Sequence, residues 1–475
     1  MEHKNVNELL NDLQGIIEIK DSVKILDQTK LRDQLVDKLA FDAVFGSLEV
    51  MVKARFLLWD LGQNLSIIPT SNHDLYVARG VNKYSGKTMP SINVRAMTYF
   101  TARATLKAAV KNNVGMVQFE LARSEIGYTN QRPAEYSVVL IAAAIKEGFQ
   151  GPLFIQADHF QVKAQKYLED PEREASAIKK LIKEAVDGGW FSFELDLSTL
   201  VDLKKNSLEE QQRLNYELSA QLTQYARSLE QDNITLGLGA EIGEVGEKNS
   251  TPEELNAFMK GYSKTLQELD ANLEGLCKIS IQTGTSHGGV VLPDGTLAQV
   301  KVDFETLGIL SQMARDEFGM GGAVQHGAST LPDNAFALFP EKETCEIHLA
   351  TGFQNILYDH EKFPPELKKK MYQYLDKNHL DERKDGQTDD QFYYKLRKKA
   401  LGPFKKELWY LDHDCKNAIM DDLEKKFTFL FKQLNVFHTQ DLVNQLVKPI
   451  KVKKSEEDFK KYLQAEKENI KGLAD

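Results

Sequence analysis

Short apolar runs alternate with helical segments between about residues 89 and 360, and this alternation constrains the fold more than any other feature. Parallel strands need long crossover connections, which helices supply, so repeated strand–helix units predict a parallel sheet. Eight runs favour a closed (β/α)8 TIM barrel over an open doubly wound sheet, whose glycine-rich dinucleotide turn we do not find. The predicted strands are 91-SINVRAM, 115-GMVQFEL, 152-PLFIQAD, 190-WFSFELDLS, 235-TLGLGAEIG, 277-CKISIQTGT, 322-GAVQH and 353-FQNILYD.

The sequence predicts three parts: a helical N-terminal extension over 1–65, the barrel over 66–360 and a charged helical C-terminal extension over 361–475. In the first part, apolar residues from Leu9 to Ile17 follow helical spacing. The end of the chain, from 451, is charged enough for an exposed or frayed tail. Within the barrel we expect helices in 99-YFTARATLKAAVKN, 133-PAEYSVVLIAAAIKEG, 173-REASAIKKLIKEAVDGG, 209-EEQQRLNYELSAQLTQYARSLEQ, 253-EELNAFMKGYSKTLQEL and 303-DFETLGILSQMARDEFG.

Composition excludes several classes of protein. The 475 residues carry a formal net charge of −10, which argues against a nucleic-acid binder because such proteins show a basic footprint. The three cysteines are widely spaced, so neither a disulfide framework nor a cysteine-rich metal site is expected. The polar start MEHKNVNELLNDLQ does not resemble a signal peptide, and no run has the length of a membrane span. We therefore expect a cytoplasmic protein without membrane or nucleic-acid partners.

Residues able to bind a metal follow four of the predicted strands. Asp158 and His159 end the third strand, Glu241 the fifth, His287 the sixth and His326 the seventh. Active sites of such barrels lie at the carboxyl ends of the strands, so these side chains should meet at one rim. Three protein ligands with an open position are typical of a catalytic zinc site, whereas a single histidine is more often a hydrogen-bonded core residue. The other histidines lack this context, and we interpret them as ordinary surface or helix residues: His3, His73, His348, His360, His379, His413 and His438.

Glycines and hydroxyl residues adjoin two of these histidines, in 284-GTSHGG and 326-HGAST. Backbone N–H groups in such turns bind phosphate oxygens, although glycine serves a tight strand-to-loop turn equally well. Beside residues that can bind a metal, these loops suggest a phosphorylated substrate held near the ion.

Taken in order, these motifs resemble the class II (metal-dependent) fructose-bisphosphate aldolases over about residues 89–360. That family has Asp-His after the third strand, Glu-x-Gly after the fifth, His-Gly after the sixth and His-Gly-x-Ser after the seventh. The matching residues are Asp158-His159, Glu241-Ile242-Gly243, His287-Gly288 and His326-Gly327-Ala328-Ser329, with Asn93, Asp196, Ser198 and Asn355 at further family positions.

The resemblance implies a function and a role for each residue. His159, His287 and His326 would hold Zn²⁺ or another divalent transition metal, with Glu241 as a nearby or alternative ligand, and a monovalent cation is a further option. The substrate would be a ketose bisphosphate, most simply fructose 1,6-bisphosphate, cleaved to dihydroxyacetone phosphate and an aldehyde. Asp158 would protonate the aldehyde oxygen, and Glu247, or else Glu244, would move the C–H proton. Asn93, Gly288, Gly327, Ser329 and Asn355 would bind substrate and its phosphate.

Several positions depart from the family pattern. Phe353 stands where the family carries Lys, Leu357 where an acid is common, and Glu120 where a small hydroxyl residue is expected. Arg123 or Arg132 could reach a substrate phosphate. These departures leave two alternatives open: a related metal-dependent aldolase or epimerase acting on a different sugar, and a non-catalytic barrel that aids assembly of a partner. The resemblance and the helical ends also favour a homo-oligomer.

Overall fold

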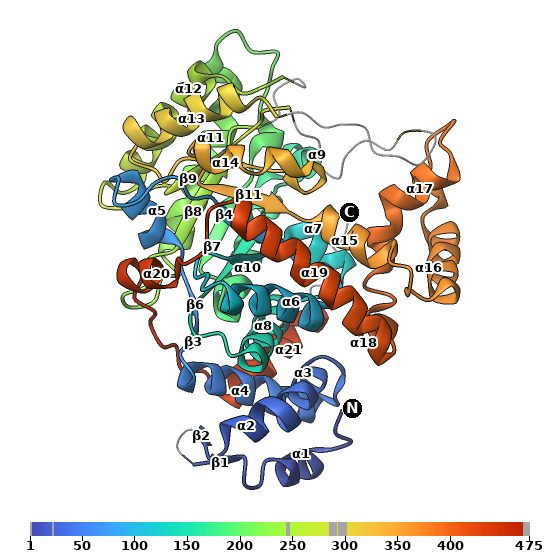
Figure 1. The fold of residues 1–475 in the computed structure, drawn as a ribbon. Coiled ribbons are helices and arrows are strands. Elements are labelled where there is room, and N and C mark those ends of the chain that lie inside the picture. Colours follow the sequence, from blue (N-terminus) through green and yellow to red (C-terminus); the bar gives the residue numbers. More distant parts are fainter. Residues whose placement is uncertain (1, 21–22, 244–247, 285–291, 293–301, 469–475) are drawn as a thin grey trace.

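A computed structural model describes residues 2–20, 23–243, 248–284, 292 and 302–468 of the chain, and eight parallel strands form its centre (Figure 1). Each strand pairs with the next, and β11 returns to pair with β4, so the sheet closes on itself. This confirms the predicted (β/α)8 TIM barrel. The barrel strands are β4 (Met89–Asn93), β5 (Gln118–Ala122), β6 (Gly151–Asp158), β7 (Ser192–Leu195), β8 (Gly237–Glu241), β9 (Lys278–Ile281), β10 (Ala323–Gln325) and β11 (Glu346–Leu349).

A further parallel strand, β3 (Ile67–Thr70), pairs with the first half of β6. Strand β7 pairs with the same strand only at Gln156 and Ala157, so β3 satisfies backbone groups of β6 that β7 does not reach. The segment that follows β3 then crosses the amino-terminal end of the barrel, where Asn72 donates hydrogen bonds to Gln118 and Gln156.

The six predicted barrel helices are confirmed, and local capping explains where several begin. Ser207 and Glu210 form a reciprocal capping box at the start of α11, and Thr251 and Glu254 form another at α12. Asp170 accepts a backbone hydrogen bond at the start of α10, whose first residue is a proline. These helices are α6 (Thr98–Lys111), α8 (Pro133–Glu147), α10 (Pro171–Gly188), α11 (Leu208–Arg227), α12 (Pro252–Leu269) and α13 (Phe304–Asp316), with shorter ones at α5 (His73–Gly80), α7 (Arg123–Tyr128), α9 (Ala164–Glu169) and α14 (Leu338–Glu341).

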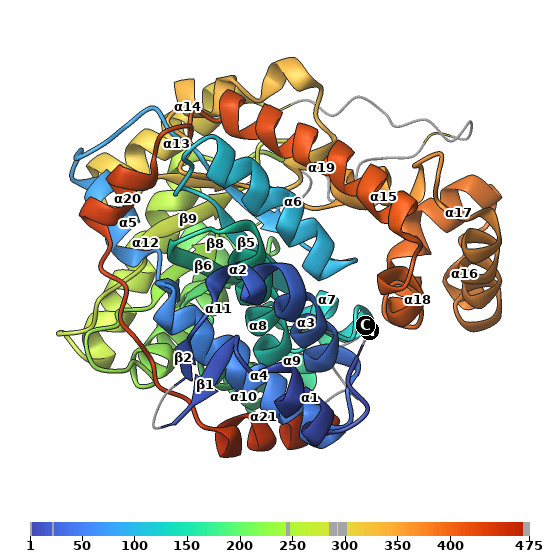
Figure 2. The ribbon, with the colours of Figure 1, turned by 60° about the horizontal axis from the view of Figure 1, so that its bottom comes forward.

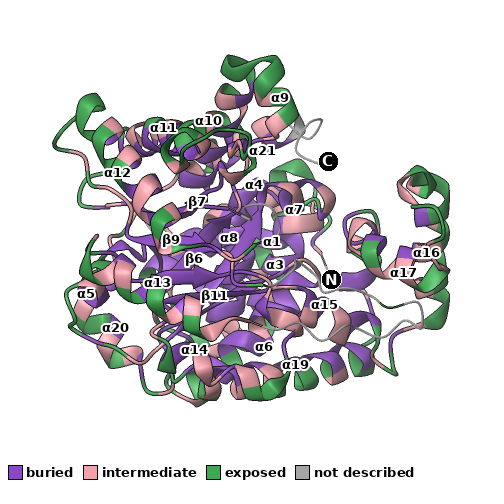
Figure 3. Cartoon of the chain, turned by 90° about the horizontal axis from the view of Figure 1, so that it is seen from above, coloured by how far each residue is buried: buried purple, intermediate pink, exposed green. Residues whose placement is uncertain are grey.

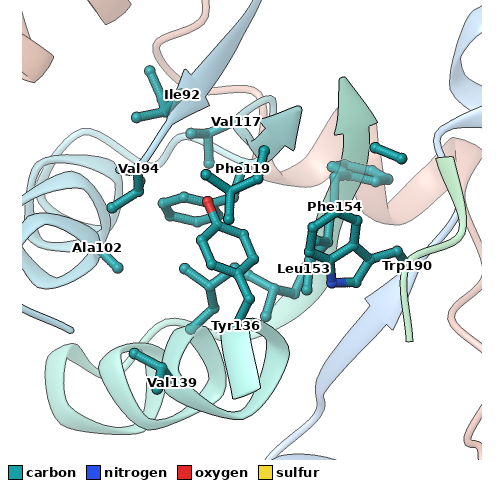
Figure 4. Close-up of a cluster of buried hydrophobic side chains, with 14 of the residues drawn as sticks. Ile92, Val94, Ala102, Val117, Phe119, Tyr136, Val139, Leu153, Phe154 and Trp190 are labelled. Carbon is teal, nitrogen blue, oxygen red and sulfur yellow. The ribbon is translucent and has the colours of Figure 1, made fainter. Parts of the chain in front are cut away.

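Alternation along the barrel strands separates an apolar outer layer from a polar interior. Phe119 of β5 lies beside Tyr136 of α8, and Trp190 packs edge-on against that tyrosine, with ring centroids 5.4 Å apart (Figure 4). On the opposite side of the strands, buried Ser91 and Glu120 of neighbouring strands are hydrogen-bonded to each other. The side chains of a strand point alternately to its two faces, so the same short segments build the core and line the barrel.

The position of the eighth strand differs from the prediction. Residues 353–359 were expected to form it, but β11 is Glu346–Leu349, and α15 (Thr351–Tyr358) follows. Phe353 and Leu357 are buried against α19 (His413–Gln433). The two residues are four apart, and this spacing is typical of a helix and not of a strand. Glu346 and His348, and not Phe353 and Asn355, are therefore the residues to compare with the family's eighth strand.

The N-terminal extension contains a β-hairpin as well as helices. Helix α1 (Val6–Asp12) is followed by β1 (Ile17–Ile19) and β2 (Val23–Ile25), so the continuous helical spacing predicted up to Ile17 is wrong beyond α1. His3, predicted to be an ordinary surface residue, is buried, and its Nδ1 lies 2.6 Å from Asp42. The remaining elements of this extension are α2 (Gln28–Lys30), a π-helical turn (Leu31–Leu35), α3 (Val36–Phe45) and α4 (Leu48–Asn64).

The C-terminal part wraps around the barrel and returns to the N-terminal extension. Helix α19 packs against α6, and α21 (Glu456–Glu468) packs against α4, as Figure 2 shows. Phe459 and Leu463 of α21 are buried, so the predicted exposed tail is wrong for this helix. None of the described helices combines the length and apolar character needed to cross a lipid bilayer. The remaining helices are α16 (Pro365–Asn378), α17 (Asp389–Leu396), α18 (Lys405–Trp409) and α20 (Gln440–Leu446).

We expect Phe459→Ala to lower the free energy of unfolding by about 3 kcal/mol, because it removes a buried ring from the α4–α21 contact. Chemical denaturation followed by circular dichroism measures the change. Lys460→Ala is the matched control, since Lys460 is exposed on the same helix. Equal stability of the two variants would contradict the docking of α21.

Candidate active site

A cavity of about 290 Å³ opens at the carboxyl end of the barrel strands. Figure 3 looks onto the molecule from above and shows the buried strands at its centre, ringed by partly exposed helices. The cavity collects residues from five barrel strands, β4, β5, β6, β10 and β11, or from the segments that follow them, together with one from the C-terminal part of the chain. Its polar lining includes Asn93, Arg95, Glu120, Arg123, Asp158, His159, Gln161, Lys163, His326, Ser329, His348 and Lys398.

His159 is held at the mouth by strained backbone and two carboxylates. Its φ of +37° lies in the left-handed region, which is uncommon for a residue other than glycine and is typical of functional positions. Its Nδ1 lies 2.9 Å from Asp196 and 3.2 Å from Glu241. Asp196 also accepts hydrogen bonds from Gln161 and Ser198, so its own orientation is fixed. Asp196 is thus positioned to orient His159, as a supporting carboxylate would if His159 bound a metal.

His326, Glu241 and His159 form a donor set that fits one metal ion. Each offers one ligand atom, and these atoms lie within 4.8 Å of one another. The His159 and His326 rings are 4.1 Å apart between centroids. A buried Glu241 oxygen and a buried Asp158 oxygen have no well-aligned hydrogen bond, although both lie near imidazole nitrogens. Nitrogen and oxygen donors at this spacing suit zinc and several other divalent transition metals.

His348 belongs to the site, contrary to its interpretation as an ordinary residue. It lies on β11, is only 5% exposed, and its ring centroid is 4.0 Å from that of His326. Its Nδ1 is 2.9 Å from Glu120 and 3.1 Å from Asp158, and its Nε2 is 2.7 Å from Glu346. The shift of the eighth strand explains the error, because β11 turns this histidine into the barrel.

The acidic residues of the site differ in the direction of their pKa shifts. Burial raises the pKa of Glu120 to about 7 despite the nearby His348 imidazole. Burial also acts to raise the pKa of Asp158, but the adjacent imidazoles of His159 and His348 bring it below its usual range. Burial raises the pKa of Glu241 as well, assisted by the Asp196 carboxylate. Glu120, whose pKa lies near neutrality, and Asp158, which stays ionised, thus both lie beside Nδ1 of His348. Two neighbouring acids that differ in pKa in this way support proton transfer.

The structure brings most, but not all, of the predicted site residues together. Asn93, Gly327 and Ser329 line the cavity with Asp158, His159 and His326, and Gly327 has the left-handed φ of +69° that glycine adopts without strain. Glu241 meets His159 at the same rim. Asn355 does not line the cavity; it lies on α15 and hydrogen-bonds Arg397 and Tyr394. The predicted residues His287, Gly288, Glu244 and Glu247 lie outside the described residues.

Of the two arginines expected to reach a phosphate, only Arg123 lines this cavity, where Glu174 pairs with it. Arg132 is paired with Glu184 and lines a different pocket. The sequence interpretation missed Glu194, Glu346 and Lys278 beneath the site, and Lys398 at its edge. Polar residues alternating with apolar ones inside buried strands were the available signal for the first three.

The family model described as "Fructose-bisphosphate aldolase class-II" matches residues 82–407, more than half of the chain. The chain belongs to this family. It is therefore assigned as a class II aldolase, an enzyme that breaks a carbon–carbon bond. The match also extends past the barrel into the C-terminal part, which the resemblance in the sequence had not covered.

The chain is similar to several solved structures. A probable tagatose 6 phosphate kinase from Sinorhizobium meliloti is 13% identical with a TM-score of 0.50, and the alignment covers 82% of this chain and 100% of that one. The fructose-bisphosphate aldolase of Campylobacter jejuni is 17% identical with a TM-score of 0.44, covering 77% and 94%. A fructuronate-tagaturonate epimerase from Cohnella laeviribosi is 13% identical with a TM-score of 0.48, covering 93% and 90%. A search of curated proteins found no match.

We expect Asp196→Ala to weaken zinc binding by about 10- to 100-fold, because His159 loses the carboxylate that orients it. Competition with a zinc-binding dye measures the affinity. Asp270→Ala, at an exposed position, should leave the affinity unchanged. Unaltered zinc affinity in Asp196→Ala would show that His159 is not oriented in this way.

Proposed function

We propose that this aldolase cleaves a phosphorylated ketose, with fructose 1,6-bisphosphate as the first substrate to test, into dihydroxyacetone phosphate and an aldehyde. The observation that carries the proposal is the donor set of His159, Glu241 and His326, which directly adjoins Asp158 at the barrel mouth. When bound there, a divalent metal would act as a Lewis acid toward the substrate's ketone. Membership in the aldolase family supports this over a non-catalytic assembly role.

Asp158 is suited to the proton transfer at the departing aldehyde. Cleavage removes the proton of the C4 hydroxyl, breaks the C3–C4 bond and later adds a proton at C3. A carboxylate held ionised beside the cavity can accept the hydroxyl proton, and in the reverse direction it returns that proton to the aldehyde oxygen. We assign the C3 proton transfer to Glu247, with Glu244 as the alternative, from the family resemblance alone.

Basic residues in the lining of the cavity suit an anionic substrate. Arg95, Arg123, Lys163 and Lys398 line it, together with the Gly327 turn. Glu125 and Glu174 partly balance the two arginines, which fixes their positions. Guanidinium and ammonium groups beside a left-handed glycine turn are the chemistry that binds phosphate oxygens.

The C-terminal part of the chain delivers Lys398 to the cavity. Its neighbour Arg397 pairs with Asp359 at 2.9 Å and donates a hydrogen bond to Asn355. Gly402 donates a backbone hydrogen bond to Tyr128 of α7, and a side chain at this glycine would collide with that carbonyl oxygen. Asn355, predicted to bind phosphate directly, does not line the cavity and would instead help to hold the segment that carries Lys398, through its contact with Arg397.

A related reaction on a different sugar is the second candidate. Glu120 and His348 extend into the cavity where the family pattern has a small hydroxyl residue and an asparagine. Two extra titratable groups near the reacting carbons favour either a different aldehyde half or an epimerisation, which needs a second proton donor. The zinc ion, an additional monovalent cation, a homo-oligomeric state and a cytoplasmic location remain predictions from the sequence and the family resemblance.

We expect the zinc-loaded protein to cleave fructose 1,6-bisphosphate in a coupled triose-phosphate assay, and a chelator to abolish the activity. Asp158→Asn should retain zinc and lose about 100-fold or more of kcat, because the hydroxyl proton loses its acceptor. A zinc-loaded protein that leaves this sugar intact but turns over another in a substrate panel would favour the second candidate.

Lys398→Met should raise KM for a phosphorylated substrate about tenfold, the loss of one charge-assisted contact, with a smaller effect on kcat. Lys399→Met is the matched control, since the Lys399 ammonium lies 2.8 Å from Glu382 and does not line the cavity. Equal KM values in both variants would remove Lys398 from the substrate site.

A further inference from the structure

A second cavity, of about 210 Å³, lies outside the barrel, where the two extensions of the chain meet barrel helices. Helices α3 and α4 pack against α8, and α21 packs against α4, so these helices are grouped together in Figure 2. Helix α7 separates this extension cavity from the active site, since its Glu125 lines the active-site cavity and its Ile126 lines the extension cavity. The two cavities have no lining residue in common.

Aliphatic side chains form much of the wall of the extension cavity. Val44 comes from α3, Met51 from α4, Ile126 from α7 and Leu463 from α21. A dry apolar cavity of about 150 Å³ is large enough to bind benzene. The extension cavity therefore has room for a molecule with one ring and a short substituent.

The charged groups at this cavity are already paired with one another. Arg55 is only 1% exposed, and its Nη1 lies 2.8 Å from Glu466 while its Nη2 lies 3.3 Å from Glu135. Lys405 also pairs with Glu135, so two cations meet two carboxylates. A charged ligand would add a buried charge without an opposite partner, which is costly. The pairing therefore favours a neutral ligand.

Arg132 has one unpartnered donor group at the cavity. Its Nε donates to one oxygen of Glu184 at 2.8 Å, and its Nη2 donates to the other oxygen of the same carboxylate. Its Nη1 has no hydrogen-bond partner among the described residues, although the residue is only 5% exposed. A buried N–H group without a partner costs free energy that an acceptor atom recovers. Because Arg132 lines the cavity, a bound molecule can supply that acceptor.

We propose that the extension cavity binds a small neutral molecule that has an apolar body and one carbonyl oxygen, and that this oxygen accepts a hydrogen bond from Nη1 of Arg132. The apolar body packs against the aliphatic wall. The carbonyl satisfies the unpartnered donor without adding charge beside Glu135 and Glu466. The proposal is independent of the sugar that the active site takes, because the two cavities share no lining residue.

Three probes of similar size test the class of ligand, in ligand-observed NMR titrations of the full chain. Acetophenone has a ring and a carbonyl oxygen, ethylbenzene lacks the oxygen, and benzoate carries a charge. We expect acetophenone to bind about tenfold more tightly than ethylbenzene, through one hydrogen bond to a charged donor, and benzoate to bind more weakly than acetophenone. Equal affinities for acetophenone and ethylbenzene, or tighter binding of benzoate, would overturn the proposal.

Two substitutions of Val44 test where the probe binds. Val44→Phe fills part of the cavity with a ring and should weaken acetophenone binding at least about tenfold. Val44→Ala is the matched control, since it enlarges the cavity at the same position and should retain binding. Circular dichroism verifies that both variants are folded. Acetophenone binding that is unchanged in Val44→Phe would place the probe elsewhere and refute the site.

Arg132→Lys tests the donor, because it keeps a positive charge beside Glu184 and removes Nη1. The advantage of acetophenone over ethylbenzene should disappear, whereas the affinity for ethylbenzene should stay unchanged because the apolar wall is intact. Arg213→Lys, at an exposed position on α11, should leave both affinities as in the wild type. An Arg132→Lys variant that still prefers acetophenone tenfold would contradict the assigned hydrogen bond.

Discussion

The active site depends on balancing buried negative charge. Carboxylates lose hydration when they enter a barrel interior, and this cost must be offset by hydrogen bonds and cations. At the inner end of the site, Lys278 offsets part of the cost of burying these carboxylates. At the outer end, His159 and His326 belong to a donor set that a metal ion would suit. The clustered acids are Glu120, Asp158, Glu194, Asp196, Glu241 and Glu346.

Most of the barrel could be predicted because its helices have clear caps and its strands are short apolar runs between them. The eighth strand could not, since only Ile347 and Leu349 of β11 are apolar, while Phe353 and Leu357 form a more conspicuous cluster nearby. Their four-residue spacing indicates a helix, and α19 covers them. Alternation of polar and apolar residues in Glu346-Ile347-His348 was the overlooked strand signal.

That His159, Glu241 and His326 lie together could be predicted, because they end or directly follow strands whose carboxyl ends share one rim. The inner layer was harder to predict, because nothing in the sequence distinguishes Lys278 from an exposed lysine at the start of a strand. Its burial follows only from the closure of the barrel. Lys398 carries no local signal at all. Its place in the cavity depends on contacts of its neighbours Arg397 and Gly402 with α15 and α7, which only the folded chain brings together.

Lys278 and Lys398 therefore have different roles in the site. Lys278 is fully buried and has all its donors engaged, so its role is to fix the orientation of Glu346 and, through it, His348. Lys398 lies at the rim, on a segment outside the barrel, where it can meet a charged group of the substrate. If Lys398 binds the substrate as proposed, a fully hydrogen-bonded inner layer and an outer wall supplied by an extension would allow the substrate's anionic end to be changed without rebuilding the residues that carry out the chemistry.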